Sequence, residues 1–258
     1  MNKYWLILLV VLAACSDKNK QQSDLDRSNL NGPVLNWIEH THEAQVQTDE
    51  LLLGKELTTN FFEYNHKGNV IKSVYTVPAY RYSETTINDE DGNPVSITFK
   101  DAEEESSIFV ELSLNKDGKI SEERWTDEQE RLDSRYLNEY EDGKLKLTKV
   151  YSKLDELNII REFHYNADGL VDTAFSYSGE RVLQYFIVKS YMAKRMTESK
   201  SFAVNKDGES RLNIHIENKY NKEDQHGNWT EKVSVVKNLM SNETTYRVIK
   251  REINYKAS

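Results

Sequence analysis

Apolar and polar residues alternate over short segments along most of this chain. The segment from Leu212 to Glu217 alternates without interruption, and Phe163, His164 and Tyr165 repeat the same order. Such segments are rich in Tyr, Phe, Val, Ile and Thr, which suit β-strands, and a period of two places successive side chains on opposite faces. No long stretch shows an apolar stripe of helical period, so the pattern predicts an all-β protein.

Polar turns that end in glycine separate many of these segments. Asn166-Ala167-Asp168-Gly169 has the form Asn-x-x-Gly, in which the Asn side chain accepts a hydrogen bond from the backbone two residues on. The glycine then takes the left-handed conformation of a hairpin turn with a bulge. The predicted turn glycines are Gly68, Gly92, Gly118, Gly143, Gly169, Gly208 and Gly227.

The first five turn glycines recur at a nearly constant interval. Their spacings are 24, 26, 25 and 26 residues, followed by 39 and 19. The shorter interval accommodates two strands, a glycine turn and a polar return loop. The interval of 39 accommodates one extra strand pair, with strands expected at 182–190 and 196–204. We therefore expect a repetitive antiparallel β-hairpin meander, with glycine turns along one margin and return loops along the other.

The composition limits how such a sheet can be covered. Apolar residues make up 38% of the chain, which is lean for a two-layer core, and residues 144–151 carry apolar side chains on both faces. The expected fold is a long curved, partly single-layer sheet that can curl on itself, stabilised by cross-strand aromatic and Lys/Glu pairs. With 30% charged residues, the sequence shows no continuous outward apolar band of the kind that a membrane-spanning barrel needs.

The N-terminus predicts export from the cytoplasm. Lys3 precedes an apolar segment from Trp5 to Leu12, which is too short to span a membrane and is typical of a signal peptide. Leu12-Ala13-Ala14-Cys15 resembles the lipobox of bacterial lipoproteins, which implies cleavage before Cys15 and lipidation of its sulfur. The predicted organisation is a signal peptide at 1–14, lipidated Cys15 with a flexible tether at 15–30, and a β-hairpin repeat domain at 31–258.

Lipidation of Cys15 can be tested directly. Radioactive palmitate is expected to label the wild-type protein in cells, whereas a Cys15→Ala variant is expected to stay unlabelled because the chain has no other cysteine. Equal labelling of the two proteins would contradict the anchor. Ser16, which is not acidic, favours sorting to the outer membrane by the rule of enteric bacteria.

The glycine-turn hairpins resemble known repeats. They are similar to YD/RHS-type repeats and to YwqK- and MORN-like hairpin repeats. The segments 29–44, 224–233 and 246–255 resemble the opening segment, the His-Gly-Asn-Trp turn and the closing strand of repeat-bearing lipoproteins of Bacteroidetes. This resemblance covers about residues 29–256 and implies an all-β extracytoplasmic protein, with no catalytic residues to carry over.

Charge and cysteine content exclude several classes of function. The net charge of −9 argues against binding to nucleic acid or to anionic lipid surfaces. Because Cys15 is the only cysteine, the mature chain has no thiol left for disulfides, thiolate metal sites or a cysteine nucleophile. The sequence has no Gly-x-Ser-x-Gly motif, and we expect neither enzymatic activity nor a cofactor.

Two groups of residues are candidates for binding. His40 and His42 lie on a predicted strand with both imidazoles on one face, and such a pair can share a metal ion if one or two more ligands are found. Exposed strand histidines are the alternative, so no metal is predicted. Trp37, Trp125 and Trp229 lie in strands or just after turns, where an aromatic row can bind glycans or peptides by stacking or provide cross-strand packing.

These features lead to two main hypotheses of function. The first is a lipid-anchored cell-envelope protein that acts as a non-enzymatic scaffold or binding surface for protein, peptide or glycan, including strand addition at an exposed edge. The alternative is a carrier of a lipid or other hydrophobic ligand, in which the sheet forms a half-barrel with Leu212, Ile214 and Ile216 on its concave face. An enzyme would require histidines and carboxylates that converge in a pocket.

Overall fold

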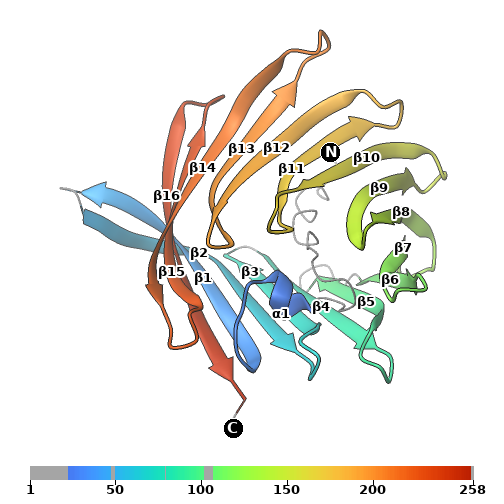
Figure 1. Cartoon of the computed structure of the whole chain (residues 1–258), viewed down its shortest axis with the longest axis horizontal. Coiled ribbons are helices and arrows are strands. Elements are labelled where there is room, and N and C mark those ends of the chain that lie inside the picture. Colours follow the sequence, from blue (N-terminus) through green and yellow to red (C-terminus); the bar gives the residue numbers. More distant parts are fainter. Residues whose placement is uncertain (1–22, 48–49, 79, 102–106, 257–258) are drawn as a thin grey trace.

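The chain folds into a closed antiparallel β-barrel. A computed structural model describes residues 23–47, 50–78, 80–101 and 107–256, and within them lie one short helix, α1 (Asp24–Arg27), and sixteen strands (Figure 1). No helix in these ranges is long and apolar enough to cross a membrane. The strands are β1 (Val34–Gln47), β2 (Glu50–Tyr64), β3 (Val70–Val77), β4 (Tyr80–Asn88), β5 (Pro94–Asp101), β6 (Ser107–Leu114), β7 (Ile120–Thr126), β8 (Leu132–Glu141), β9 (Lys144–Ser152), β10 (Leu157–Tyr165), β11 (Val171–Ser178), β12 (Leu183–Met192), β13 (Arg195–Val204), β14 (Ser210–Glu223), β15 (Trp229–Asn238) and β16 (Glu243–Tyr255).

Each strand pairs with its neighbours in the sequence, and the first strand pairs with the last. Val34 lies opposite Tyr255 and Ala44 lies opposite Tyr246, so β1 is bonded to both β16 and β2. The predicted antiparallel hairpin meander is confirmed. The predicted long curved, partly single-layer sheet is wrong because the two end strands meet and close it. Closure leaves no edge strand among the described strands of the barrel wall, but residues 50–58 of β2 extend past β3, which pairs with β2 only at residues 59–64, so this part of the β1–β2 hairpin keeps a free edge.

The glycine turns have the predicted hydrogen bonds. Asn166 Oδ1 accepts from the backbone N–H groups of Asp168 and Leu170, both at 3.0 Å, and Gly169 has a φ of 77°. The return loops at 127–131, 152–156 and 178–182 repeat the same backbone bonds, with left-handed residues Glu130, Asp155 and Arg181. One turn type therefore recurs at both ends of the barrel, and glycine marks mainly one of them.

Gly208 lies at the other end of the barrel from the remaining six turn glycines. Three strands, β11 to β13, separate the turns of Gly169 and Gly208, and an odd number of strands moves the turn to the opposite end. The strands predicted at 182–190 and 196–204 are confirmed as β12 and β13. The prediction that all glycine turns share one margin is wrong, because the interval of 39 residues contains one extra strand rather than an extra strand pair; the hairpin between β12 and β13 turns at Ala193 and Lys194 without glycine. We call the two ends the glycine-turn end, with six turn glycines, and the return-loop end.

The two-residue turn of Ala193 and Lys194 stores backbone strain. Their φ angles are 48° and 62°, a left-handed pair that Asn-Gly adopts readily and that costs other residues about 1–2 kcal/mol each. An Ala193→Asn/Lys194→Gly variant is expected to raise the free energy of unfolding by about 1 kcal/mol or more, measured by urea denaturation. Gly143, at the matching position of the β8–β9 turn with a φ of 76°, provides the reverse control, because Gly143→Ala is expected to lower it. Equal stability of all three proteins would contradict this account.

Residues 23–33 cross the glycine-turn end of the barrel. The backbone N–H of Leu25 donates to the carbonyl of Gly68 at 3.0 Å, and Asn29 Nδ2 donates to the carbonyl of Lys194 at 2.7 Å. These contacts lie in the β2–β3 and β12–β13 turns, so the segment connects two separate parts of the rim (Figure 1). A buried cluster lies beneath it, formed by Leu30, Val34, Trp37 and Tyr64.

Candidate functional site

Strand alternation divides the barrel wall into an inner and an outer face. Arg251 of β16 lies opposite Glu39 of β1, and Glu39 lies opposite Asn60 of β2, so these three side chains share one face. Followed around the sheet, the same face includes Val110 of β6 and Phe163 of β10, which are only 1% and 2% exposed. This is the inner face, and its polar members are the candidates for ligand contact.

The inner face carries an aromatic and charged cluster where the barrel closes. The Arg251 guanidinium lies 4.2 Å from the ring centre of Trp37 and 3.6 Å from that of Trp229, and its Nε donates to Glu39 at 3.1 Å. Trp37 Nε1 in turn donates to the hydroxyl of Tyr64 at 2.7 Å. Arg251 Nη1 is buried and has no hydrogen-bond partner. Cation–π contacts and one ion pair therefore hold this guanidinium while leaving one donor group unsatisfied.

Lys232 of β15 adds a second cation to this cluster. Its Nζ lies 4.7 Å from the ring centre of Trp229, and no ion pair with a described residue involves it. Burial lowers the pKa of Lys232 to about 8; Glu39 opposes this shift and Arg251 contributes to it. Neither Lys232 nor Arg251 was identified as a candidate from the sequence. We call Trp37, Glu39, Trp229, Lys232 and Arg251 the seam cluster.

The barrel interior opens toward the return-loop end. Ile214 and Tyr185 lie on the inner face near that end and are each 38% exposed, and the inner residue Arg247 is exposed as well. A barrel of sixteen strands is wider than its inner side chains can fill. The seam cluster, in contrast, lies at the covered glycine-turn end, so the inner wall of β14 to β16 runs from a buried charged, aromatic region to an accessible one that contains Ile214 and Arg247.

A bulge changes the predicted lining of this wall. Ile214 pairs with Ser201 whereas Leu212 pairs with Phe202, which leaves Asn213 as the extra residue. The bulge turns Leu212 to the outer face, while Ile214 and Ile216 face inward. The prediction that all three line one concave face is therefore correct for the two isoleucines only.

Two carboxyl groups lie on the inner face of β4 and β7. Burial raises the pKa of Glu84 on β4 to about 6, although a hydrogen bond from Ser73 opposes the shift. Burial also raises the pKa of Glu123 on β7, against hydrogen bonds from Trp125 and Asn138. Burial therefore makes both inner carboxyl groups easier to protonate than ordinary glutamates.

The three candidate tryptophans do not form one row. Trp37 and Trp229 meet through Arg251 at the seam, whereas Trp125 lies on β7, where it stacks on Phe99 with ring centres 5.1 Å apart. All three face inward, so any contact that they make with a ligand takes place inside the barrel.

His40 and His42 project from the same face, as their spacing predicts, and in the closed barrel this is the outer face. Their ring centres are 6.4 Å apart, and His40 Nδ1 lies 3.2 Å from a carboxylate oxygen of Glu56, a neighbour from β2 that the sequence did not indicate. Hydrogen bonds from Thr59 and His40 lower the pKa of Glu56. The carboxylate thus has partners already, and these histidines belong to a cross-strand polar contact.

A second outer cluster has the ligand types of a metal site. Atoms of Glu198, His215 and Glu217 lie within 4.8 Å of one another. Lys200 is 2.7 Å from Glu198, and Lys237 is 2.9 Å from Glu217. These lysines neutralise both carboxylates, so the arrangement is a ladder of ion pairs across β13 to β15. It lies where a membrane-spanning barrel would present apolar side chains to lipid.

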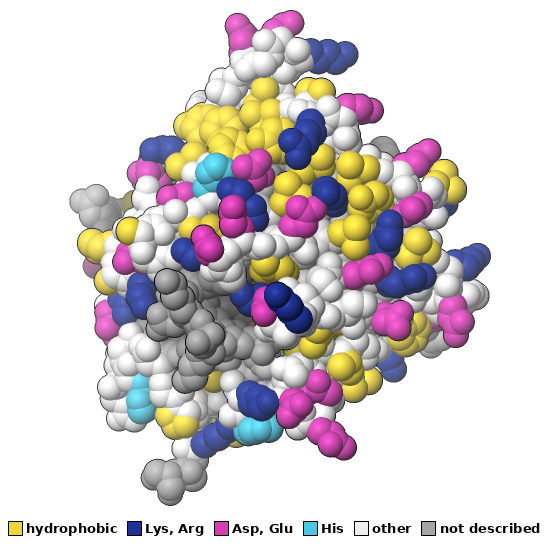
Figure 2. Space-filling view, turned by 45° about the vertical axis from the view of Figure 1, so that its right-hand side comes forward, with side chains coloured by type: hydrophobic (Ala, Val, Ile, Leu, Met, Phe, Trp, Pro, Cys, Tyr) yellow, Lys and Arg dark blue, Asp and Glu magenta, His cyan; other side chains and the backbone are white. Residues whose placement is uncertain are grey.

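The outer face also carries a row of aromatic side chains. Phe175, Phe186 and Phe202 lie opposite one another on β11, β12 and β13, with ring centres 5.8 Å and 4.6 Å apart along the row. Apolar side chains gather on the upper part of the face in Figure 2, over these strands, while charged side chains of both signs are interspersed below them. Cross-strand stacking accounts for the row itself.

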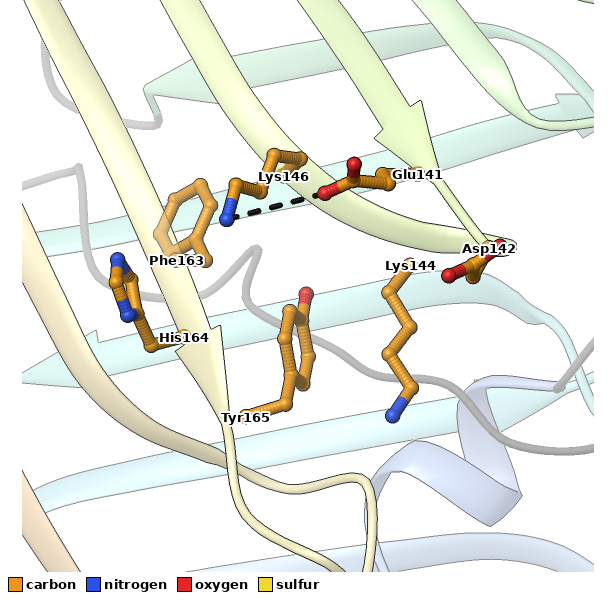
Figure 3. A pocket seen from close by; sticks show the side chains of 7 residues that line it. All are labelled: Glu141, Asp142, Lys144, Lys146, Phe163, His164 and Tyr165. Carbon is orange, nitrogen blue, oxygen red and sulfur yellow. Dashed lines mark ion pairs between the residues drawn. The ribbon is translucent and has the colours of Figure 1, made fainter.

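A small pocket of about 330 Å³ lies beside the β8–β9 turn and β10 (Figure 3). Lys146 pairs with Glu141 at 3.9 Å, and Lys144 lies 5.3 Å from the ring centre of Tyr165. Both lysines thus have partners within the pocket lining, and the pocket is a weaker candidate than the seam cluster.

Comparisons with known proteins show a similar fold but do not show a function. No protein-family model and no curated protein sequence matches the chain. A porin-like protein from Bacteroides uniformis is similar in structure, with a TM-score of 0.51 and 10% identity over 87% of this chain and 98% of that one. A DUF1329 family protein from Desulfovibrio piger has a TM-score of 0.34 and 13% identity over 87% of both chains. A second porin-like protein, from Bacteroides vulgatus, has a TM-score of 0.33 and 8% identity over 85% and 98% of the two chains. The first of these shows a shared barrel fold.

Proposed function

We propose that this protein binds an amphipathic small molecule inside its barrel and is a lipid-anchored, non-enzymatic protein of the bacterial cell envelope. The observation that carries the proposal is the graded inner wall, with exposed Ile214 near the open end and the seam cluster at the covered end. The lipobox-like segment at Cys15 and the likeness to a porin-like barrel from a Bacteroides species support the envelope. Ion pairs on the outer face favour a barrel that stands in water rather than in lipid.

Binding of a neutral amphiphile tests this proposal. The methyl ester of 11-(dansylamino)undecanoic acid is expected to bind the purified full-length protein saturably, with energy transfer from tryptophan to the dansyl group as the signal. An Ile214→Asp variant is expected to weaken binding roughly tenfold or more, because a carboxylate in an apolar contact must be desolvated. Val188→Asp is the matched control, since Val188 has a similar exposure, 36%, on the outer face. Absence of saturable binding, or equal loss in both variants, would contradict the proposal.

The outer phenylalanine row favours a second candidate function, docking of an envelope protein, peptide or glycan. This hypothesis predicts that a Phe186→Ser variant loses a partner that wild-type protein retains in pull-downs from native envelopes. It loses its support if both proteins retain the same partners.

A further inference from the structure

The seam cluster carries more positive than negative charge. Lys232 and Arg251 contribute two cations, and Glu39 is the one carboxylate paired with either of them among the described residues. Both cations lie against the Trp229 ring, and the positive charge of Arg251 lowers the pKa of Lys232. A bound anion would relieve this repulsion.

Neighbouring side chains fix the orientation of the Arg251 guanidinium, and one of its nitrogen donors has no acceptor. Its guanidinium is held between Trp37 and Trp229, and Glu39 takes the hydrogen bond of Nε. The side chain is 11% exposed, and buried Nη1 has no acceptor. A buried donor without an acceptor costs free energy, which an oxygen of a carboxylate or phosphate would recover through a charge-assisted hydrogen bond.

The wall beyond the cluster suits an alkyl chain. Register places Ile249 beside Lys232. Ser234 follows, between Asn218 and Arg247, and beyond it Val236 lies opposite Ile216, with Ile214 near the return-loop end. A chain that lies along these side chains would reach from the covered end toward the open one. The order of side chains therefore sets an orientation, with the head group inside and the chain directed outward.

We infer that the seam cluster is a head-group site, in which Lys232 and Nη1 of Arg251 bind the carboxylate or phosphate of an amphiphile whose chain lies along β14 to β16. This inference rests on the proposed function and specifies the ligand class. It makes Lys232 and Arg251 the specificity-determining residues for an anionic over a neutral ligand.

Comparison of charged and neutral probes tests the site. We expect the purified full-length protein to bind 11-(dansylamino)undecanoate about ten- to a hundredfold more tightly than its methyl ester, the range of one or two charge-assisted hydrogen bonds. A dansylated alkyl phosphate shows whether phosphate is preferred to carboxylate. Acetate and inorganic phosphate, which lack a chain, separate recognition of an amphiphile from recognition of a free anion.

Substitution of Lys232 locates the preference. Within the Lys232→Met variant the acid is expected to bind no more tightly than the ester, and Lys232→Arg is expected to retain the preference for the acid. Lys219→Met is the matched control, because Lys219 is exposed on the outer face of the adjacent strand. If the acid and the ester bind equally to the wild type, or if Lys232→Met weakens both by the same factor, the head-group site is overturned while the proposed function stands. If neither probe binds, the proposed function fails as well.

Discussion

A Glu39→Ala variant is expected to lose about 3–5 kcal/mol of its free energy of unfolding, which is the usual cost of removing one partner of a buried ion pair. Glu39 and Arg251 are 17% and 11% exposed, and their 3.1 Å contact joins β1 to β16. Without the carboxylate, the guanidinium stays buried between two tryptophans, with Nη1 already unsatisfied. Urea denaturation followed by tryptophan fluorescence measures the loss.

An outer ion pair provides the control for this variant. Glu217 is 2.9 Å from Lys237, but it is 48% exposed, so Glu217→Ala is expected to cost less than about 1 kcal/mol. A Glu39→Ala/Arg251→Met double variant is expected to be more stable than Glu39→Ala alone, because it no longer buries an unpaired charge. Similar losses at Glu39 and Glu217 would show that the seam pair does not hold the barrel closed.

The strands and hairpins were predictable because their signals are local. Period-two alternation and Asn-x-x-Gly turns act within a few residues, and Asn166 with Gly169 adopts the expected turn in full. The turn between the strands predicted at 182–190 and 196–204 could not be assigned to Ala193 and Lys194, because neither residue type favours a left-handed backbone. The interval between Gly169 and Gly208 contains one extra strand rather than the expected pair, which reversed the expected position of Gly208.

Closure of the barrel was not predictable in the same way. It depends on pairing of β1 with β16, and Glu39 and Arg251 lie 212 residues apart in the chain. The order of strands in a meander does not determine the total curvature of the sheet. An apolar content of 38% was equally compatible with an open sheet. The alternation of Ile249, Arg251 and Ile253 showed that these side chains share a face, but not that this face points inward.

The candidate site forms only when the barrel closes, so local sequence patterns could not identify its residues as a group. The sequence singles out Trp37 and Trp229 as aromatic candidates, yet their common partner is Arg251, which local spacing cannot connect to either of them. Lys232 belongs to the segment Glu231-Lys232-Val233-Ser234-Val235, whose mixture of charged, polar and valine residues is common in solvated strands. What distinguishes it is burial against Trp229, a property of the closed barrel.

Replacement of Trp37 by alanine is expected to lower the free energy of unfolding by about 3–5 kcal/mol, the range for removing a large buried aromatic side chain. Trp37 is 5% exposed, stacks on Phe62 with ring centres 4.6 Å apart, and supports one side of Arg251. Because it also packs against Leu30 and Val34, the variant is expected to loosen both the seam and the segment that covers the glycine-turn end. Hydrogen exchange should therefore accelerate in β16 and in residues 28–33 before it does so in β6 and β7.

Trp37→Phe separates stacking from the hydrogen bond. Phenylalanine retains an aromatic ring against Phe62 and Arg251 but cannot donate to Tyr64, whose hydroxyl accepts from Trp37 Nε1 at 2.7 Å. This variant is expected to lose about 1–3 kcal/mol, the cost of leaving a buried polar group without its partner together with a smaller ring. If Trp37→Ala and Trp37→Phe were equally unstable, the hydrogen bond to Tyr64 rather than aromatic packing would account for the contribution of Trp37 to stability. If neither lost stability, closure would depend on the backbone ladder of β1 and β16 alone.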